Sequence, residues 1–346
     1  MKELLDTPDK MVEDGRPAFG RFRTAFKQVN MLDANPSRLH WAPRGFLNFR
    51  LKEWEHFSII TPTHFLGIAV VDAKYMGVSW CYALDRRTKA MVVHERQLVG
   101  KAQPIGRELY DAHFSFKDKD YEVSVHNYLI KGLHHLSYAT TGPKNPPLTG
   151  RFEIYERPED TQPMISVLPI GKRKVFYSHK AACPVSGEYS VAGENFTADP
   201  AASFALTDVH KAYYPFRTTW KWATFACRDA EGTLLGLNLT EGVFGDGGDM
   251  NENCIWHGNR MSLLSAAKFE IPADIMQPWT VSTVDGRSSL VFTPMGLRSQ
   301  TLDLKLVRSW YMAPLGEFTG FLVDDDGVKH EVKKAFGICE HHRVTW

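Results

Sequence analysis

The chain has 346 residues, of which 43% are hydrophobic, 23% charged and 12% aromatic, and its net charge is +1. This composition is that of a globular protein with a large core, and the near-neutral charge excludes strong attraction to nucleic acid or anionic membranes. The five cysteines are scattered and form no C-x-x-C pair, so neither a disulfide framework nor a thiolate zinc site is expected.

The N-terminal half is predicted to be an irregular arm followed by antiparallel strands. Residues 1–50 are mixed and rich in proline, whereas short apolar segments separated by Gly, Pro and Asp follow one another from residue 56. In YEVSVHNYL, apolar Val123 and Val125 alternate with polar residues, which predicts one buried face. Strands are predicted at residues 56–64, 65–73, 77–85, 90–99, 112–118, 121–127, 134–141, 151–158 and 174–181.

The C-terminal half repeats this style without an internal sequence repeat. VSGEYSVAGENF predicts a hairpin with turns near Gly187 and Gly193, and DDDG at 324–327 predicts a tight turn. Further strands are predicted at residues 218–229, 233–242, 251–258, 289–295, 317–323 and 328–338, and short helices near 3–14, 201–205 and 262–266.

This pattern predicts an all-β protein with two antiparallel β domains side by side and few short helices. We place the first domain, which includes the arm, at residues 1–175 and the second at residues 176–346. Closed barrels or stacked sandwiches would protect this many strand edges, and the aromatic content favours barrels that hold a ligand cavity.

Several common site motifs are missing from the sequence. There is no G-x-x-x-x-G-K-[ST], no dinucleotide fingerprint and no G-x-S-x-G motif, so no cofactor is expected. GDGGDMNEN at 245–253 predicts an acidic turn that could hold calcium through Asp246, Asp249 and Glu252, although it lacks EF-hand spacing. Adjacent histidines, at 134–135 and 341–342, would point to opposite strand faces, so no metal site is expected.

The stretch LTDVHKAYYPFRTTWKWATF at 206–225 carries the strongest chemical signal. On a strand, Asp208 and His210 face one side, and so do Trp220 and Trp222. An acid beside an aromatic wall is partly desolvated, which raises its pKa and lets it donate a proton near neutral pH. His210 would relay or orient that proton. The alternative, that Asp208 caps a turn and the tryptophans fill a barrel, stays open.

Other polar residues interrupt apolar segments in both halves: Glu53 and Glu55 flank Trp54, residues 251–253 read NEN, and Glu340 ends KKAFGICE. Any one of these is more often structural, but several together indicate a shared polar site.

The sequence RLKEWEHFSIITPTHFLGIAVVDAKYMG at 50–77 resembles the early segment of an uncharacterised bacterial family with a domain of unknown function. The resemblance extends over nearly the whole chain, and its later landmarks are Asp208, Pro215, Phe216, Trp220, Trp222, Asn251 to Asn253, Phe292 to Pro294, Gly337, Glu340 and Trp346.

That family is similar to a lipocalin-like, calycin-type group that includes tocopherol cyclase, carotenoid hydratase and fungal Diels-Alderases. The resemblance implies two barrel-like domains with an apolar site in or between them. In the carotenoid hydratases, an Asp near the start of the second half is thought to protonate a double bond. Asp208 has a comparable place, although Leu206 and Thr207 replace the aromatic neighbours found there.

The leading hypothesis is therefore a lyase- or isomerase-type enzyme that hydrates, cyclises or isomerises an apolar unsaturated molecule. Asp208 would donate the proton, His210 or Glu252 would steer water or remove a proton, and Asp208→Asn should abolish most activity while leaving the fold near intact. The expected substrate-binding residues are Trp80, Tyr214, Trp220, Trp222, Asn251, Asn253, Glu53, Trp54 and Glu340.

Two other functions remain open at this point. The chain could be a non-catalytic binder of lipid or isoprenoid, or a carbohydrate-active enzyme in which Asp208 and Glu252 form a carboxylate pair. No apolar run is long enough for a signal peptide or a membrane helix, so a cytoplasmic protein is expected. The expected partner is a small apolar or aromatic ligand rather than nucleic acid, and a homodimer is one expected assembly.

Overall fold

The computed structural model describes residues 4–34, 42–142, 145–170, 174–243, 250–303 and 307–346, and it confirms an almost entirely antiparallel β protein. The chain forms two compact units. The first comprises Leu4–Val167 with residues 174–213, and the second consists mainly of Tyr214–Trp346. The expected boundary after residue 175 falls inside a strand, and the division into units comes after Tyr213 instead.

The first unit contains most of the chain's shorter elements. From the N-terminus they are β1 (Val12–Glu13), β2 (Arg16–Pro17), β3 (Gly20–Phe22), the 3-10 helix η1 (Met31–Asp33), α1 (Arg44–Arg50), β4 (Lys52–Ile60), β5 (His64–Asp72), β6 (Met76–Asp85), β7 (Met91–Val99), β8 (Ala112–Asp118), β9 (Tyr121–Tyr128), the 3-10 helix η2 (Leu129–Lys131), β10 (Leu133–Thr140), β11 (Leu148–Tyr155), β12 (Met164–Ile170), β13 (Lys174–Val191), β14 (Glu194–Ala198) and β15 (Phe204–Ala212).

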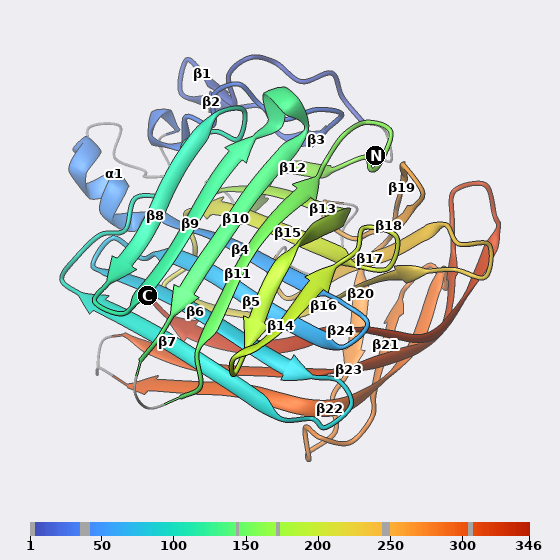
Figure 1. Ribbon diagram of the computed structural model, residues 1–346. Helices are drawn as coiled ribbons and strands as arrows, with labels where there is room; N and C mark the ends of the chain where they lie inside the picture. Colours follow the sequence, from blue (N-terminus) through green and yellow to red (C-terminus); the bar gives the residue numbers. More distant parts are fainter. Residues whose placement is uncertain (1–3, 35–41, 143–144, 171–173, 244–249, 304–306) are drawn as a thin grey trace. The chain divides into compact units, whose positions relative to one another are not determined.

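The main sheet of this unit has the order β7-β6-β5-β4-β15-β13-β11-β10-β9-β8, and the strands β8 to β11 lie side by side in Figure 1. The long strand β13 pairs with β15 through Phe176–Pro184 and with β11 through Val185–Val191, so it belongs to both halves of the sheet. Side chains from both halves, among them Phe57 on β4 and Val123 on β9, enclose one hydrophobic core. The sheet therefore curls on itself in the manner of a barrel.

The second unit is a nine-stranded antiparallel sheet with the order β19-β18-β17-β16-β24-β23-β22-β21-β20. Its core includes Phe225, Leu237 and Trp279. The Phe269 amide of β20 donates to Glu241 Oε2 of β17 at 2.8 Å, so the β20 end of the sheet curls round to β17. Its strands are β16 (Arg217–Arg228), β17 (Leu234–Glu241), β18 (Cys254–His257), β19 (Arg260–Leu263), β20 (Ala267–Glu270), β21 (Trp279–Thr283), β22 (Ser288–Asp303), β23 (Arg308–Val323) and β24 (Lys329–Thr345).

Several local predictions need correction. The three expected helices are wrong: the described part of 3–14 contains β1 and isolated bridges, 201–205 is a turn leading into β15, and 262–266 begins inside β19. Gly187 is not a turn, because β13 runs through it with φ +156°, and a Cβ there would lie 2.2 Å from a backbone oxygen. The turns at Gly193 and at DDDG are confirmed, since β13 pairs with β14 and Gly327 donates to Asp324.

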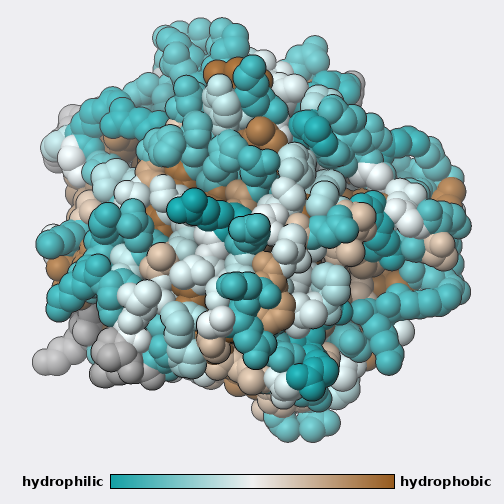
Figure 2. All heavy atoms as spheres, viewed as in Figure 1, coloured by the Kyte–Doolittle hydropathy of each residue, from teal (hydrophilic) through white to brown (hydrophobic). Residues whose placement is uncertain are grey.

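The surface carries few large apolar side chains. Figure 2 shows mainly hydrophilic and intermediate residues on this face, with apolar ones in small separate groups, which is ordinary for a folded protein. Among the described residues, no helix has the length and hydrophobicity that crossing a bilayer requires.

Candidate functional site

An ionic cluster surrounds Asp208 on the strand face opposite the hydrophobic core of the first unit. Asp208 and His210 lie on β15, Lys180 lies opposite Asp208 on β13, and Trp54 lies opposite His210 on β4. Strand alternation sends these side chains to one face while the core residues Phe57 and Ala205 point to the other. We call Trp54, Lys180, Asp208 and His210 the Asp208 cluster.

The electrostatics of Asp208 differ from the expectation. Lys180 Nζ and His210 Nε2 each lie 2.6 Å from Asp208 Oδ1, and Trp54 Nε1 donates to Oδ2 at 3.3 Å. Burial by itself would raise the pKa of Asp208, but the charges and hydrogen bonds of His210 and Lys180 outweigh it and hold this pKa well below its usual range. The prediction of a protonated Asp208 is therefore wrong, and the carboxylate is ionised at neutral pH.

Aromatic rings enclose the imidazole of His210. Trp54 stacks on it with centroids 4.7 Å apart and an interplanar angle of 13°, and Phe176 meets it edge-on at 4.7 Å. The ring is thus oriented by Asp208 and held by two aromatic rings, one stacked on it and one perpendicular to it. A histidine held in this way can carry a proton next to an ionised acid, which is the arrangement of an acid–base pair.

The side chain of Glu53 is buried and forms ion pairs with lysines. It lies on the opposite face of β4 from Trp54, where Lys211 Nζ approaches it at 2.8 Å and Lys74 also forms an ion pair with it. Burial would raise the pKa of Glu53, but the two lysines lower it overall. Lys74 also binds Asp72 at 2.7 Å, so these four residues form a buried network that joins β4, β5 and β15.

A second buried network, not predicted from the sequence, crosses the interior of the first unit. Asn127 Nδ2 donates to both carboxylate oxygens of Glu55, at 2.9 and 3.1 Å, and Asn127 Oδ1 lies 2.7 Å from His134 Nδ1. Glu156 bridges His134 at 3.0 Å and His179 at 2.6 Å. Both ring nitrogens of His134 thus have a polar partner, Asn127 on one side and Glu156 on the other. We call these five residues the Glu156 network.

Replacing Glu55 with glutamine is expected to stabilise the protein near pH 8 and to change little near pH 4. Burial raises the pKa of Glu55 to about 7, although hydrogen bonds from Asn127 oppose this. The folded state therefore loses stability as pH rises from the ordinary value of 4.5 through about 7. Removing the charge should raise the free energy of unfolding by about 1–2 kcal/mol at the higher pH. Urea unfolding at both pH values measures this, and a variant less stable near pH 8 would contradict it.

The second unit has its own polar and aromatic cluster around Glu340. Trp220 Nε1 donates to Glu340 Oε2 at 3.3 Å, and the Tyr311 hydroxyl donates to Oε1 at 2.5 Å. His342 packs edge-on against Trp220, and the Arg298 guanidinium lies 5.0 Å from the Tyr311 ring centroid. Burial, Arg298 and His341 lower the pKa of His342 to about 3, so this ring is neutral at physiological pH.

The NEN segment forms a buried hydrogen-bonded turn. Thr240 Oγ1 donates to Glu252 Oε1 at 2.6 Å, and the Thr240 amide donates to Asn253 Oδ1 at 2.7 Å. Asn251 Oδ1 accepts from the Asn253 amide, while Asn238 accepts from Trp222 and donates to the Glu252 carbonyl. These contacts assign the segment a structural role. Asp246 and Asp249, named above for calcium, lie outside the described residues.

The predicted site residues thus fall into separate groups. Asp208, His210 and Trp54 meet in the first unit, as do Trp220 and Glu340 in the second. Asp208 and Glu252 belong to different units, so a joint role for the two acids stays a prediction. The remaining aromatic residues are Trp80, half-buried on β6, and Tyr214, which is buried and stacks on Trp220 and Trp346.

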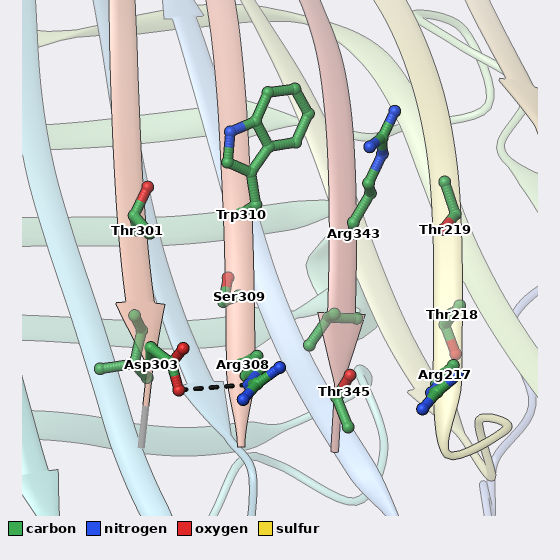
Figure 3. Close-up of a pocket in the computed structure, with 12 residues that line it drawn as sticks. Arg217, Thr218, Thr219, Thr301, Asp303, Arg308, Ser309, Trp310, Arg343 and Thr345 are labelled. Atoms are coloured by element: carbon green, nitrogen blue, oxygen red, sulfur yellow. Dashed lines mark hydrogen bonds and ion pairs between the residues drawn. The ribbon is translucent and has the colours of Figure 1, made fainter. Parts of the chain in front are cut away.

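A separate cavity of about 330 Å³ lies on the second unit (Figure 3). Thr219, Arg343, Trp310 and Thr301 cross four neighbouring strands there, and Asp303 pairs with Arg308 at 3.2 Å. None of the predicted site residues lines this cavity. Its arginine-rich lining suits a polar or anionic molecule more than an apolar one.

Sequence reasoning missed Lys180, Tyr311 and Glu156, and it named Glu55 without its partners in the Glu156 network. The sequence does contain a pattern that points to these two buried acids. Glu156 falls in the same alternation as the core residues Phe152 and Ile154, and Glu55 falls in the same alternation as Phe57. A charged residue in phase with a buried apolar row must find partners inside the core.

Comparison with known proteins places the chain in a family. Residues 2–346 match the family described as domain of unknown function DUF2804, so the chain belongs to it, and the resemblance to such a family is confirmed. No curated protein matches the chain. Two similar solved structures are kievitone hydratase from Nectria haematococca (11% identity, TM-score 0.49) and CghA with Sch210972 (8%, 0.45), each covering 85% of this chain and 88% of the other. At these values function must be argued from the chain's own residues.

Proposed function

We propose that this DUF2804 protein is an enzyme that transfers a proton to a small, largely apolar unsaturated molecule, with His210 and Asp208 as its acid–base pair. The observation that carries the proposal is the buried Asp208–His210 contact of 2.6 Å, with His210 stacked on Trp54. Ion pairs with a purely structural role also occur inside proteins. This pair differs in that it lies beside the ring of Trp54, which is only partly buried.

The ionised state of Asp208 assigns the roles differently from the sequence hypothesis. His210 would deliver the proton to an alkene carbon, and Asp208 would stabilise the imidazolium and orient it. Because Nε2 faces Asp208, the proton would leave from Nδ1. The resulting carbocation would lie against the Trp54 face, which attracts cations. The cation would then add water and release one of its protons, lose a proton from an adjacent carbon, or close a ring and lose a proton. The proton would return to His210 Nδ1 in each case, and the products would be those of hydration, isomerisation or cyclisation.

The test is deuterium incorporation from D₂O into geraniol, farnesol and related polyenes, followed by mass spectrometry. His210→Gln should lower the rate about 10²- to 10⁴-fold, the usual contribution of a general acid. The matched control is His126→Gln, which alters a histidine that also pairs with an aspartate, Asp111, but at the surface. Equal rates in His210→Gln and the unmodified protein would contradict the assignment. Binding without any turnover would favour the alternative of a lipid or isoprenoid binder.

A further inference from the structure

Two loops of the second unit hold an aspartate in the same way. Asp229 follows β16, and its Oδ1 accepts from the amides of Thr233 at 2.8 Å and Glu231 at 3.0 Å. Asp324 follows β23, and its Oδ1 accepts from the amides of Val328 at 2.9 Å and Asp326 at 3.0 Å. In each loop the backbone fixes one carboxylate oxygen, and the other oxygen, Oδ2, points to a histidine.

The rings of the two histidines lie close together, with their planes tilted by 39°. His257 Nε2 is 2.8 Å from Asp229 Oδ2, and His330 Nε2 is 2.9 Å from Asp324 Oδ2. The two ring centroids are 4.1 Å apart. One ligand atom each from Asp229, His257 and His330 lies within 4.8 Å of the other two, and no other such trio of His, Cys, Asp or Glu occurs among the residues that the structure describes.

This donor set suits a divalent transition metal. Two imidazoles and a carboxylate are ligands of zinc and of related first-row ions, with metal–ligand distances of about 2.0–2.2 Å. Ligand atoms within 4.8 Å need only small side-chain movements to close on such an ion. The side chain of His257 is 30% exposed, so an ion and water can reach the site.

The charge around these residues also favours a cation. Asp229 and Asp324 are both carboxylates, and the loop amides that donate to each Oδ1 suit a negatively charged group. The next two acids of the DDDG turn are engaged elsewhere, Asp325 with Arg287 at 2.8 Å and Asp326 with Arg260 at 2.7 Å. Asp229 and Asp324 thus bring two negative charges to a pair of histidines.

We propose that Asp229, His257 and His330 form a binding site for a divalent transition-metal ion such as Zn²⁺ or Co²⁺, in which Asp324 orients the ring of His330. A carboxylate bonded to a metal-ligating histidine is a common means of fixing the ring. The site is independent of the function proposed above, because it uses none of the Asp208 cluster. The sequence analysis considered histidines only as adjacent pairs, whereas His257 and His330 are far apart in the chain.

Titration of the chelator-treated full-length protein with Co²⁺ tests the proposal through the visible absorption of the bound ion. One equivalent should bind with saturation and be displaced by Zn²⁺. His257→Ala and His330→Ala should each weaken binding at least about 100-fold, and Asp324→Asn about 10- to 100-fold. His126→Ala is the matched control, because His126 packs against His113 with tilted rings and pairs with Asp111 on the surface without forming a converging trio. It should bind Co²⁺ like the unmodified protein.

Three results would overturn the proposal: no saturable Co²⁺ binding, unchanged affinity in both histidine variants, or an equal loss in His126→Ala. If the histidine variants fail to fold, Asp229→Asn decides the question, since asparagine keeps an acceptor for the loop amides but removes the ligand charge. Unchanged affinity in that variant would count against the site, and a loss of at least about tenfold would support it.

Discussion

Replacing Asp208 with asparagine is expected to lower the free energy of unfolding by about 3–5 kcal/mol, the usual cost of removing one partner from a buried ion pair. The variant would leave Lys180 and His210 facing a neutral amide, and the side chains of these two residues are only 3% and 6% exposed. This differs from the expectation, based on the sequence, that the substitution leaves the fold near intact. Urea unfolding near pH 7 measures the effect.

The effect should depend on pH in a defined direction. The folded-state pKa of Asp208 is depressed, so its stabilisation is complete above the ordinary value of 3.8 and is lost as pH falls below it. The difference between Asp208→Asn and the unmodified protein should therefore shrink in acid. Asp111→Asn is the control, because it removes an aspartate that pairs with His126 at the surface, and it should change stability by no more than about 0.5 kcal/mol. Equal effects for the two substitutions would show that burial of the Asp208 cluster has no energetic consequence.

Glu156→Gln is expected to have an effect of similar size, about 3–5 kcal/mol near pH 7. Burial would raise the pKa of Glu156, but His179 and His134 lower it to about 2. A difference of this size from the ordinary value of 4.5 corresponds to a stabilisation on the order of 3 kcal/mol. A glutamine can accept from only one of the two histidines, so the other would face an amide donor. Urea unfolding again measures the loss.

The stabilisation by Glu156 should disappear as pH falls from 4.5 toward about 2, because its folded-state pKa is the lower one. Glu153→Gln supplies a matched control three residues earlier. Glu153 also lies near a histidine, His135 at 3.8 Å, but its side chain is 54% exposed. It should change stability by less than about 1 kcal/mol. A pH-independent loss in Glu156→Gln would instead indicate a packing effect.

Much of the fold follows from local sequence patterns. Val123 and Val125 alternate with polar residues, and β9 buries that face as predicted. The DDDG turn was likewise predictable, because a short acidic segment ending in glycine has few alternatives. The position of the domain boundary was harder to predict from the sequence. β13 pairs with β11 and β15 pairs with β4, and nothing in the local sequence of residues 174–213 identifies those partners.

The contact between Asp208 and His210 was predictable from the sequence, but the charge state of Asp208 was not. The spacing of Asp208 and His210 placed both on one face, and their contact follows. Lys180 comes from a different strand, and its ion pair reverses the direction in which burial alone would move the pKa of Asp208. Trp220 and Trp222 seemed to be the aromatic neighbours of Asp208, but Trp54, which is 154 residues away in sequence, occupies that position in the first unit. Long-range pairing decides such neighbours, and a single sequence does not reveal it.

The pairing of β4 with β15 has a consequence for synthesis in the cell. One edge of β4 pairs with β5, and the other edge pairs with β15. The second pairing can form only after Phe204 to Ala212 have left the ribosome. At roughly 5–20 residues per second, one edge of β4 would wait about 7–30 seconds for that partner. During this interval a nascent chain that already carries β4 to β11 exposes an unpaired strand edge, which is where aggregation begins. A chain interrupted near residue 175 would keep that edge permanently, so the first unit completes its folding late in translation.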